Sequence, residues 1–223
     1  MDGDPWNRQE RRGLRDPALA QRPPAMVVAE YLELVPAGKR GINLGCGGMT
    51  FKDWLNIDQD QPWHLDIMCD LMKGLPFLHE SQFDAVFSEA FFEHVPRQAA
   101  LNLLRDCHRA LRPGGHVRIS IPDLHKYVRA YNGEPLYPEL RDAIIKEFGD
   151  FSGTRGELLN YLMRESGHVW IYTQEELAWL LCRAGFVDVR PCIVRESSIP
   201  LLHDREDRPE GQCSLIAEAM KPE

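Results

Sequence analysis

The sequence predicts an α/β fold built on a mostly parallel β-sheet. In residues 41–48 (GINLGCGG), a short apolar run leads straight into a glycine turn, as it does where a buried parallel strand ends in a ligand-binding loop. Strand-like and helix-like segments alternate along most of the chain, which is typical of parallel sheets with right-handed crossovers. The last two strand-like segments, 186–190 and 214–220, are joined without a helix, which indicates one antiparallel strand.

Length and composition favour one large domain that works without a nucleic-acid or membrane partner. The chain has 223 residues, with 26 Lys and Arg against 34 Asp and Glu, and the formal net charge of −8 disfavours nucleic acid. No run of 18 apolar residues and no secretion signal is seen. The six cysteines are scattered, so we expect reduced thiols, no metal site and a cytoplasmic protein.

The first third of the chain predicts an unusually short link between two strands. Residues 1–24 are polar and charged and predict a disordered tail, or an arm that folds over a ligand, ahead of a single domain at 25–223. A helix is expected at 25–35. The first two strands are expected at 40–44 and 54–57, and Asp58 follows Gly45 by only 13 positions. Because a parallel crossover usually needs a dozen residues or more, this link holds about one helical turn at most.

The central part of the chain has clearer signals. A third strand is expected at 65–69 and a fourth at 83–88, where apolar residues predominate. A helix should then begin at Pro96 and run to about Leu111, since proline is favoured in a first helical turn. The glycines at 114–115 stop this helix, and the alternating residues 116–121 form the fifth strand.

Residues 124–170 interrupt the alternation and predict a helical insertion or lid after the fifth strand. They contain two or three helical pieces, at about 124–131, 138–148 and 155–165, and no strand. The regular pattern then resumes. Thr173 and Glu176 form a capping box at the start of a helix that ends at Gly185, and the last two strands follow.

Five sequence blocks lie in order at the expected strand ends. They are Asn43–Gly48, Trp54–Asp58, Cys69–Leu71 with Leu75–Phe77, Phe83–Val86 with Glu93–His94, and Leu111–Gly115 with Ile119–Asp123. Taken together, the ordered blocks resemble the class I S-adenosylmethionine-dependent methyltransferases, in the branch often labelled methyltransferase type 11. Residues 173–177 and 184–186 also fit, so the resemblance covers about residues 40–220.

The resemblance implies a Rossmann-like sheet of seven strands in the order 3-2-1-4-5-7-6, with the last strand antiparallel. It also implies helices on both faces and S-adenosylmethionine as the methyl donor. The ends of strands one and four would then meet at the switch point of the sheet, where ligands bind in such folds. Backbone atoms of Gly45, Cys46 and Gly47 should face the cofactor. A redox role for Cys46 is disfavoured by its place in this turn.

The same resemblance assigns roles to four further residues. The Asp58 carboxylate would accept hydrogen bonds from both ribose hydroxyls, which its two oxygens suit. Asp70 would accept from the adenine amino group, the Leu71 N–H would contact the ring, and Ser88 would lie near the sulfonium. The alternatives are an exposed turn carboxylate at Asp58 and ordinary structural roles for Asp70 and Ser88.

Two departures from the family pattern concern the first loop. The family often has an acid two residues before the first glycine, and this chain has Asn43. An amide can still hydrogen-bond near the methionine part of the cofactor, but the ammonium loses a charge partner. The short link to Asp58 is the second departure. With so short a link, the carboxylate of the cofactor gains less stabilisation than usual from a helix N-terminus.

Candidate catalytic residues lie at strand ends and at the end of the insertion. His94 follows the fourth strand and could act as a base near neutral pH. Asp123 ends the fifth strand, and His168 lies where a lid would close. The structural alternatives are a histidine paired with Glu93, a helix cap at Asp123 and a packed histidine at 168.

The sequence therefore predicts an S-adenosylmethionine-dependent methyltransferase that acts on a small molecule or a sugar, more readily at oxygen than at nitrogen. Two other classes remain open at this point. One is a non-catalytic binding module with the same sheet. Asn43 and the short link are compatible with that class. The other is a nicotinamide-dependent oxidoreductase, which Thr50 disfavours because it stands at the third glycine position of that fingerprint.

Overall fold

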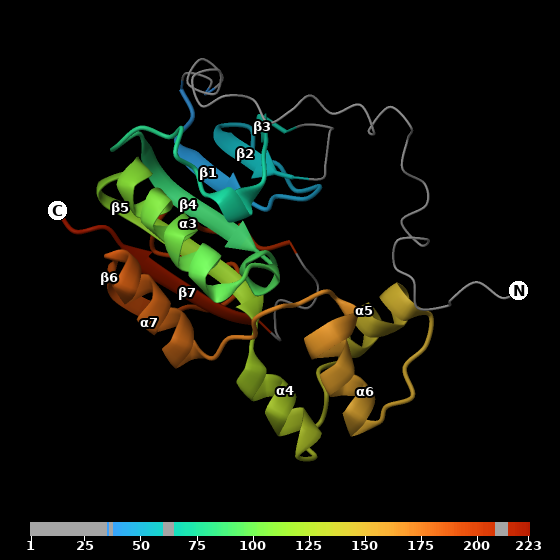
Figure 1. The fold of residues 1–223 in the computed structure, drawn as a ribbon. Helices are drawn as coiled ribbons and strands as arrows, with labels where there is room; N and C mark the ends of the chain where they lie inside the picture. Colours follow the sequence, from blue (N-terminus) through green and yellow to red (C-terminus); the bar gives the residue numbers. More distant parts are fainter. Residues whose placement is uncertain (1–34, 36–37, 60–64, 208–213) are drawn as a thin grey trace, which may run out of the picture.

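A computed structural model describes residue 35 and residues 38–59, 65–207 and 214–223. The expected tail at 1–24, and the expected helix at 25–35 apart from its last residue, lie outside the described residues. Seven strands form one sheet in the order β3-β2-β1-β4-β5-β7-β6 (Figure 1). The strands are β1 (Gly41–Leu44), β2 (Trp54–Asp58), β3 (Ile67–Met68), β4 (Phe83–Glu89), β5 (Leu111–Pro122), β6 (Val187–Pro191) and β7 (Ser214–Met220).

The pairing confirms the predicted strand order and the antiparallel last strand. β1 pairs in parallel with β2 and β4, and β4 pairs in parallel with β5. β7 runs antiparallel to both β5 and β6. Two strands differ in length from the prediction, since β3 has only two residues and β5 begins at Leu111, five residues before the alternating segment. Gly114, at φ +71°, takes a left-handed conformation where the pairing of β5 with β4 shifts register, so the strand begins irregularly before His116.

Two helices cover one face of the sheet. α3 (Arg97–Ala110) and α7 (Gln174–Ala184) lie side by side across it (Figure 1). α3 buries one apolar stripe, which includes Leu103, Leu104 and Cys107, against the strands. The predicted capping box opens α7, because the Thr173 hydroxyl accepts from the backbone N–H of Glu176. This layer is the main hydrophobic core.

The opposite face lacks a helix in the described part of the chain. In this strand order, β2 lies on one side of β1, and β5 lies on the opposite side of β4. Because parallel crossovers are right-handed, the β1–β2 link and the β4–β5 link should lie on opposite faces of the sheet. α3 occupies the second link, but residues 45–53 form only turns, as their length predicted. Leu202, with Ile199 and Leu201, packs instead against Trp54, Ala85 and Phe87. A late loop thus covers the surface that a first crossover helix would cover.

Two buried amides hold the short β1–β2 link in place. Asn43 Nδ2 donates to the carbonyl oxygen of Met49 at 2.7 Å and to Asn56 Oδ1 at 3.2 Å. Asn56 Oδ1 also accepts from the Phe51 N–H, and its Nδ2 donates to Asp66 Oδ2 at 2.9 Å. A carboxylate at position 43 has no proton to donate. The amide at 43 and the short link are therefore one structural feature, because only a donor can hold Met49.

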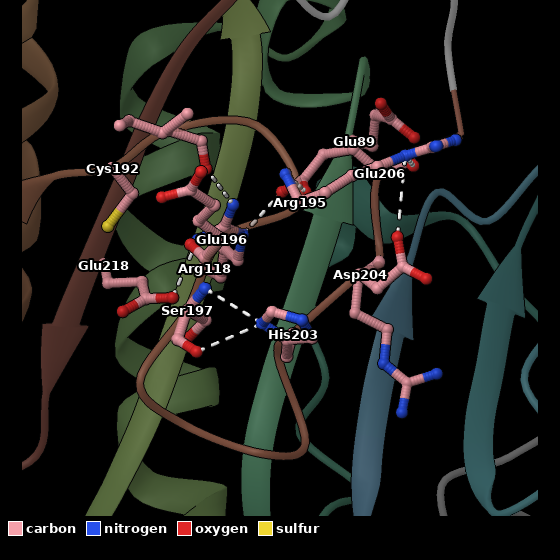
Figure 2. A network of polar contacts seen from close by, with 12 residues as sticks. Glu89, Arg118, Cys192, Arg195, Glu196, Ser197, His203, Asp204, Glu206 and Glu218 are labelled. Carbon is pink, nitrogen blue, oxygen red and sulfur yellow. Dashed lines mark hydrogen bonds and ion pairs between the residues drawn. The ribbon is translucent and has the colours of Figure 1, made fainter.

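A buried ionic network ties the late loop to the sheet (Figure 2). Arg118 on β5 is fully buried and donates from Nε to Glu206 at 2.5 Å and from Nη1 to Glu218 at 2.8 Å. Its remaining hydrogen bonds reach the carbonyl oxygens of Ile193 and Glu196. All charges in this group are paired, as burial requires. The guanidinium therefore fixes the path of residues 193–206 across the sheet.

We expect part of the stability to disappear in acid through Glu218. Burial acts to raise the pKa of Glu218, but hydrogen bonds from Ser197, Arg190 and Arg118 outweigh it, and the pKa lies below its ordinary value of 4.5. A carboxyl whose folded-state pKa is depressed stabilises the fold above its unfolded pKa and loses that contribution as the pH falls through the folded value. The melting temperature should fall below about pH 4.5, and Glu218→Gln should flatten that part of the profile, whereas Asp53→Asn, at an exposed acid, should not.

The insertion forms a small helical subdomain beyond the carboxyl ends of the parallel strands (Figure 1). It contains α4 (Leu124–Tyr131), α5 (Pro138–Phe148), α6 (Arg155–Asn160) and the π-helix η4 (Tyr161–Glu165), close to the predicted pieces. Its own core is formed by Tyr127, Leu140, Ile144, Leu158, Tyr161 and Leu162. No helix among the described residues has the length and apolarity needed to cross a membrane.

Candidate functional site

The glycine turn after β1 is open on one side and closed on the other. Gly45 and Gly47 adopt φ +61° and +52°, which side-chain-bearing residues rarely adopt. A Cβ at Gly45 would lie 2.4 Å from the ring of Phe91, which follows β4, whereas a Cβ at Gly47 or Gly48 would meet nothing within 4 Å. Backbone atoms at 47–48 are thus approachable by a ligand, and Phe91 covers the first glycine.

Asp58 lies at the end of β2, beside this turn. Its Oδ2 accepts from the Gly47 N–H at 2.8 Å, and its Oδ1 accepts from the Gln59 N–H at 2.6 Å. Asp58 is half-buried, and it is the last residue of β2. A strand-end carboxylate next to an open glycine turn suits a ligand that carries vicinal hydroxyl groups.

Cys46 is a small buried residue of the turn, as the sequence indicated. Burial and the nearby Asp58 charge raise the pKa of its thiol to about 12. The reactive form of cysteine is the thiolate, which is scarce at neutral pH when the pKa is this high. The structure therefore gives Cys46 no nucleophilic character.

The other predicted cofactor residues have different surroundings. Asp70 caps the short helix η2 (Leu71–Lys73) by accepting from the Met72 N–H, and its side chain is 41% exposed. The Leu71 side chain is buried in the core, so only its backbone can contact a ligand. Ser88 is fully buried and donates to the carbonyl oxygen of Leu44 at 3.1 Å, which joins the ends of β4 and β1. The side chains of Ser88 and Asn43 are thus engaged within the sheet.

A cavity of about 160 Å³ lies between the ends of β4 and β5 and the helical insertion. It brings together two of the three predicted catalytic residues, since His94 and His168 stack edge to face with ring centroids 4.9 Å apart. The third, Asp123, caps α4 by accepting from the His125 N–H and is not among the residues that line the cavity. Polar lining residues include Glu89, Glu93, His94, Ser120, Tyr161 and His168.

Two acids that line this cavity were candidates from the sequence but were not among the three favoured catalytic residues. Glu89 and Glu93 are only 5% and 1% exposed. Glu93 Oε1 lies 4.0 Å from His168 Nε2, and Glu89 Oε2 accepts from the Asp207 N–H at the end of the late loop. Their position directly after the fourth strand was the available signal, because side chains at that point of a parallel sheet face the ligand crevice.

Comparison with known proteins decides the family. The sequence matches the family described as "Methyltransferase domain" over residues 18–190, well over half of the chain. The chain belongs to this methyltransferase family. It is an enzyme domain, its methyl donor is S-adenosylmethionine, and the family match leaves no support for the nicotinamide alternative. No curated protein matches the methyltransferase significantly.

Solved structures agree with the methyltransferase fold at low sequence identity. An S-adenosylmethionine-dependent methyltransferase from Archaeoglobus fulgidus is 14% identical, with a TM-score of 0.51, over 87% of this chain and 91% of that chain. One from Methanosarcina mazei is 15% identical, with a TM-score of 0.47, over 86% of this chain and 97% of that chain. At 14% identity, the similarity to the Archaeoglobus fulgidus structure supports the fold alone.

Proposed function

We propose that this methyltransferase holds S-adenosylmethionine at the glycine turn and transfers its methyl group to a hydroxyl of a small molecule or a sugar. In this proposal, backbone atoms of Gly45, Cys46 and Gly47 face the methyl donor, and Asp58 accepts from its ribose hydroxyls. Asp70 and the Leu71 N–H contact the adenine. Ser88 and Asn43 act indirectly, by positioning the ends of β4 and β1 and the short link.

The features of the turn support this assignment. Gly47 and Gly48 leave space that a Cβ would fill, and the half-buried Asp58 carboxylate stands beside that space. The exposed part of the Asp70 carboxyl can accept from an amino group. When bound, the donor supplies a sulfonium whose methyl carbon is attacked in line by a nucleophile. The residues of this chain therefore have to bind and align the acceptor and accept its proton.

The observation that carries the choice of acceptor is the histidine pair in the cavity. A hydroxyl is a poor nucleophile until its proton is removed, and an imidazole can accept a proton near neutral pH. The cavity adjoins the end of β4, where Phe91 also touches Gly45, so the acceptor site and the glycine turn share one strand end. A volume of about 160 Å³ suits a small group, and the insertion encloses it. The net charge of −8 disfavours nucleic-acid substrates.

A radiolabelled transfer assay tests this proposal. Purified protein is incubated with methyl-labelled S-adenosylmethionine and panels of phenols, sugars and amines, and products are identified by mass spectrometry. We expect transfer to a hydroxyl, reduced about 100-fold or more in His94→Asn and His168→Gln, since a positioned base contributes about 10²–10⁴-fold. His125→Gln, at an exposed histidine on α4, is the matched control. Transfer to amines alone, or equal rates in all three variants, would contradict the proposal.

A further inference from the structure

Three side chains at the cavity form a group of the kind that holds a metal ion. Glu93 and His94 lie on the 3₁₀-helix η3 (Phe92–His94) after β4, and His168 lies near the end of the insertion, after η4. One nitrogen of each histidine and one carboxylate oxygen lie within 4.8 Å of one another. Ligand atoms around a tetrahedral zinc ion lie about 3.4 Å apart, so these side chains have to move closer together to hold an ion.

Backbone contacts hold these two segments together. The N–H groups of Val169 and Trp170 both donate to the carbonyl oxygen of Glu93, at 2.8 and 3.1 Å. The residue that carries the carboxylate is therefore fixed to the residues next to His168. Metal sites depend on such support, because ligands from separate segments must be positioned before the ion arrives.

The backbone contacts of the two Nδ1 atoms determine which ring nitrogens can bind an ion. His168 Nδ1 lies 2.5 Å from the carbonyl oxygen of Leu162, and His94 Nδ1 lies 3.3 Å from that of Gly167. A carbonyl oxygen only accepts, so each Nδ1 carries the proton and Nε2 has the lone pair of the neutral ring. Metal-binding histidines are commonly oriented in this way, with the other ring N–H donating to a backbone carbonyl.

Burial gives a reason for a positive ion at this place. The side chains of Glu93 and His168 are only 2% and 6% exposed. A second buried acid, Glu89, lines the same cavity. Buried carboxylates in proteins are paired or coordinate metals, so an acidic cavity lining of this kind suits a cationic ligand.

We propose that Glu93, His94 and His168 bind a divalent first-row transition metal ion whose remaining positions face the acceptor cavity. Two imidazoles and one carboxylate suit zinc, iron, manganese or cobalt better than magnesium or calcium, which prefer all-oxygen sites. This inference rests on the proposed function for its role. With the ion bound, the two imidazoles would act on the acceptor through the ion and would not take its proton directly. The ion would bind and orient the hydroxyl oxygen and make that hydroxyl more acidic, and the proton would pass to the Glu89 carboxylate, which lines the same cavity. The sequence, with its scattered cysteines, had led us to expect no metal.

Direct metal binding tests this inference without any methyl transfer. Full-length protein is stripped with a chelator and titrated with Zn²⁺ by calorimetry and with Co²⁺ by visible absorption. We expect one ion per chain, with no sulfur-to-cobalt charge-transfer band, because imidazole and carboxylate are the ligands. Glu93→Gln, His94→Asn and His168→Gln should each weaken binding by about 100-fold or more, since the loss of an outer-shell partner alone costs about 10–100-fold.

The control is His125→Gln, which should bind the ion like the unmodified protein. Circular dichroism identifies any variant that fails to fold, and three separate ligand substitutions protect the test against one such loss. The metal site is wrong if the unmodified protein binds no ion. It is also wrong if the three ligand variants bind the ion as tightly as the control does. Methyl transfer to a hydroxyl without a bound ion would then leave the proposed function standing. An ion bound at this site with no hydroxyl acceptor methylated would reject the proposed function instead.

Discussion

Replacing Asp58 with alanine should lower the affinity for S-adenosylmethionine about 100- to 1000-fold. The proposed contacts are two hydrogen bonds from ribose hydroxyls to a charged acceptor, and together they contribute about 3–4 kcal/mol. Asp58 also accepts from the Gly47 N–H at 2.8 Å, so the substitution removes a support of the glycine turn as well. Calorimetric titration of the purified variant measures the loss directly.

Two controls separate the ribose contact from the support of the turn. Asp53→Ala removes an exposed acid from the same link and should leave the affinity unchanged. Titration with S-adenosylhomocysteine and with its 2′-deoxy form separates the two effects. If Asp58 contacts the diol, Asp58→Ala should reduce the affinity less for the deoxy ligand than for S-adenosylhomocysteine. An equal penalty for both ligands would assign Asp58 to the turn alone, and equal binding by the two variants would remove it from the site.

The strand order was predicted correctly because the ordered sequence blocks resemble a family that has this sheet. The residues alone indicated a mostly parallel sheet with one antiparallel strand, since the apolar run before Gly45 marks a strand end and residues 186–190 and 214–220 are joined without a helix. The brevity of the β1–β2 link was also visible in the spacing to Asp58. The loop that covers this link was not predicted, because residues 199–205 pack against Trp54 and Phe87, which are distant in sequence. Nothing local in that segment reveals the contact.

The candidate site shows the same division between local and long-range information. His94 and His168 were each selected for their place next to a strand end or an insertion, and the structure brings them together. Glu93 was also a candidate from the sequence, as a partner of His94, but its place beside His168 is visible only in three dimensions. Asp123 looked equivalent from its place after the fifth strand, but its carboxylate caps α4. Position along the chain predicts the neighbourhood of a residue well and the direction of its side chain poorly.

The structure explains why this chain has Asn43 where the family often has an acid. From the sequence, the amide was a lost charge partner for the methyl donor. In the structure, its Nδ2 holds Met49 and Asn56, which a carboxylate could not do. Asn56 in turn donates a hydrogen bond to Asp66, so the amide pair connects the link to the residue before β3. The amide therefore belongs to the short link, and the two departures have one cause.

Replacing Arg118 with methionine should lower the free energy of unfolding by about 3–5 kcal/mol. The substitution leaves Glu206 and Glu218 buried without their shared cation, and breaking a buried ion pair by removing one partner costs about this much. For a chain of this size, the melting temperature should fall by about 6–12 °C. Urea unfolding followed by circular dichroism gives the free energy, and calorimetry gives the melting temperature.

The triple variant Arg118→Met, Glu206→Gln, Glu218→Gln should recover much of that loss. It removes both negative charges along with the cation, and the glutamine oxygens can still accept from Arg195 and Arg190, which now bond these acids. Arg105→Met, at an exposed position on α3, should change stability by less than about 0.5 kcal/mol. If the triple variant is no more stable than Arg118→Met, the loss comes from packing and not from unpaired charge.

The same substitution should also affect the cavity, because the network and the acceptor site share one loop. Arg118 fixes Glu206, and the next residue, Asp207, donates its backbone N–H to Glu89 at 3.1 Å. When Glu206 loses its cation, the loop end at 207 loses its anchor, and Glu89 loses a fixed partner. Arg118→Met should therefore weaken metal binding or methyl transfer even at temperatures where it is folded, and the triple variant should restore them only in part. Full activity in folded Arg118→Met would show that the loop supports the sheet and not the cavity.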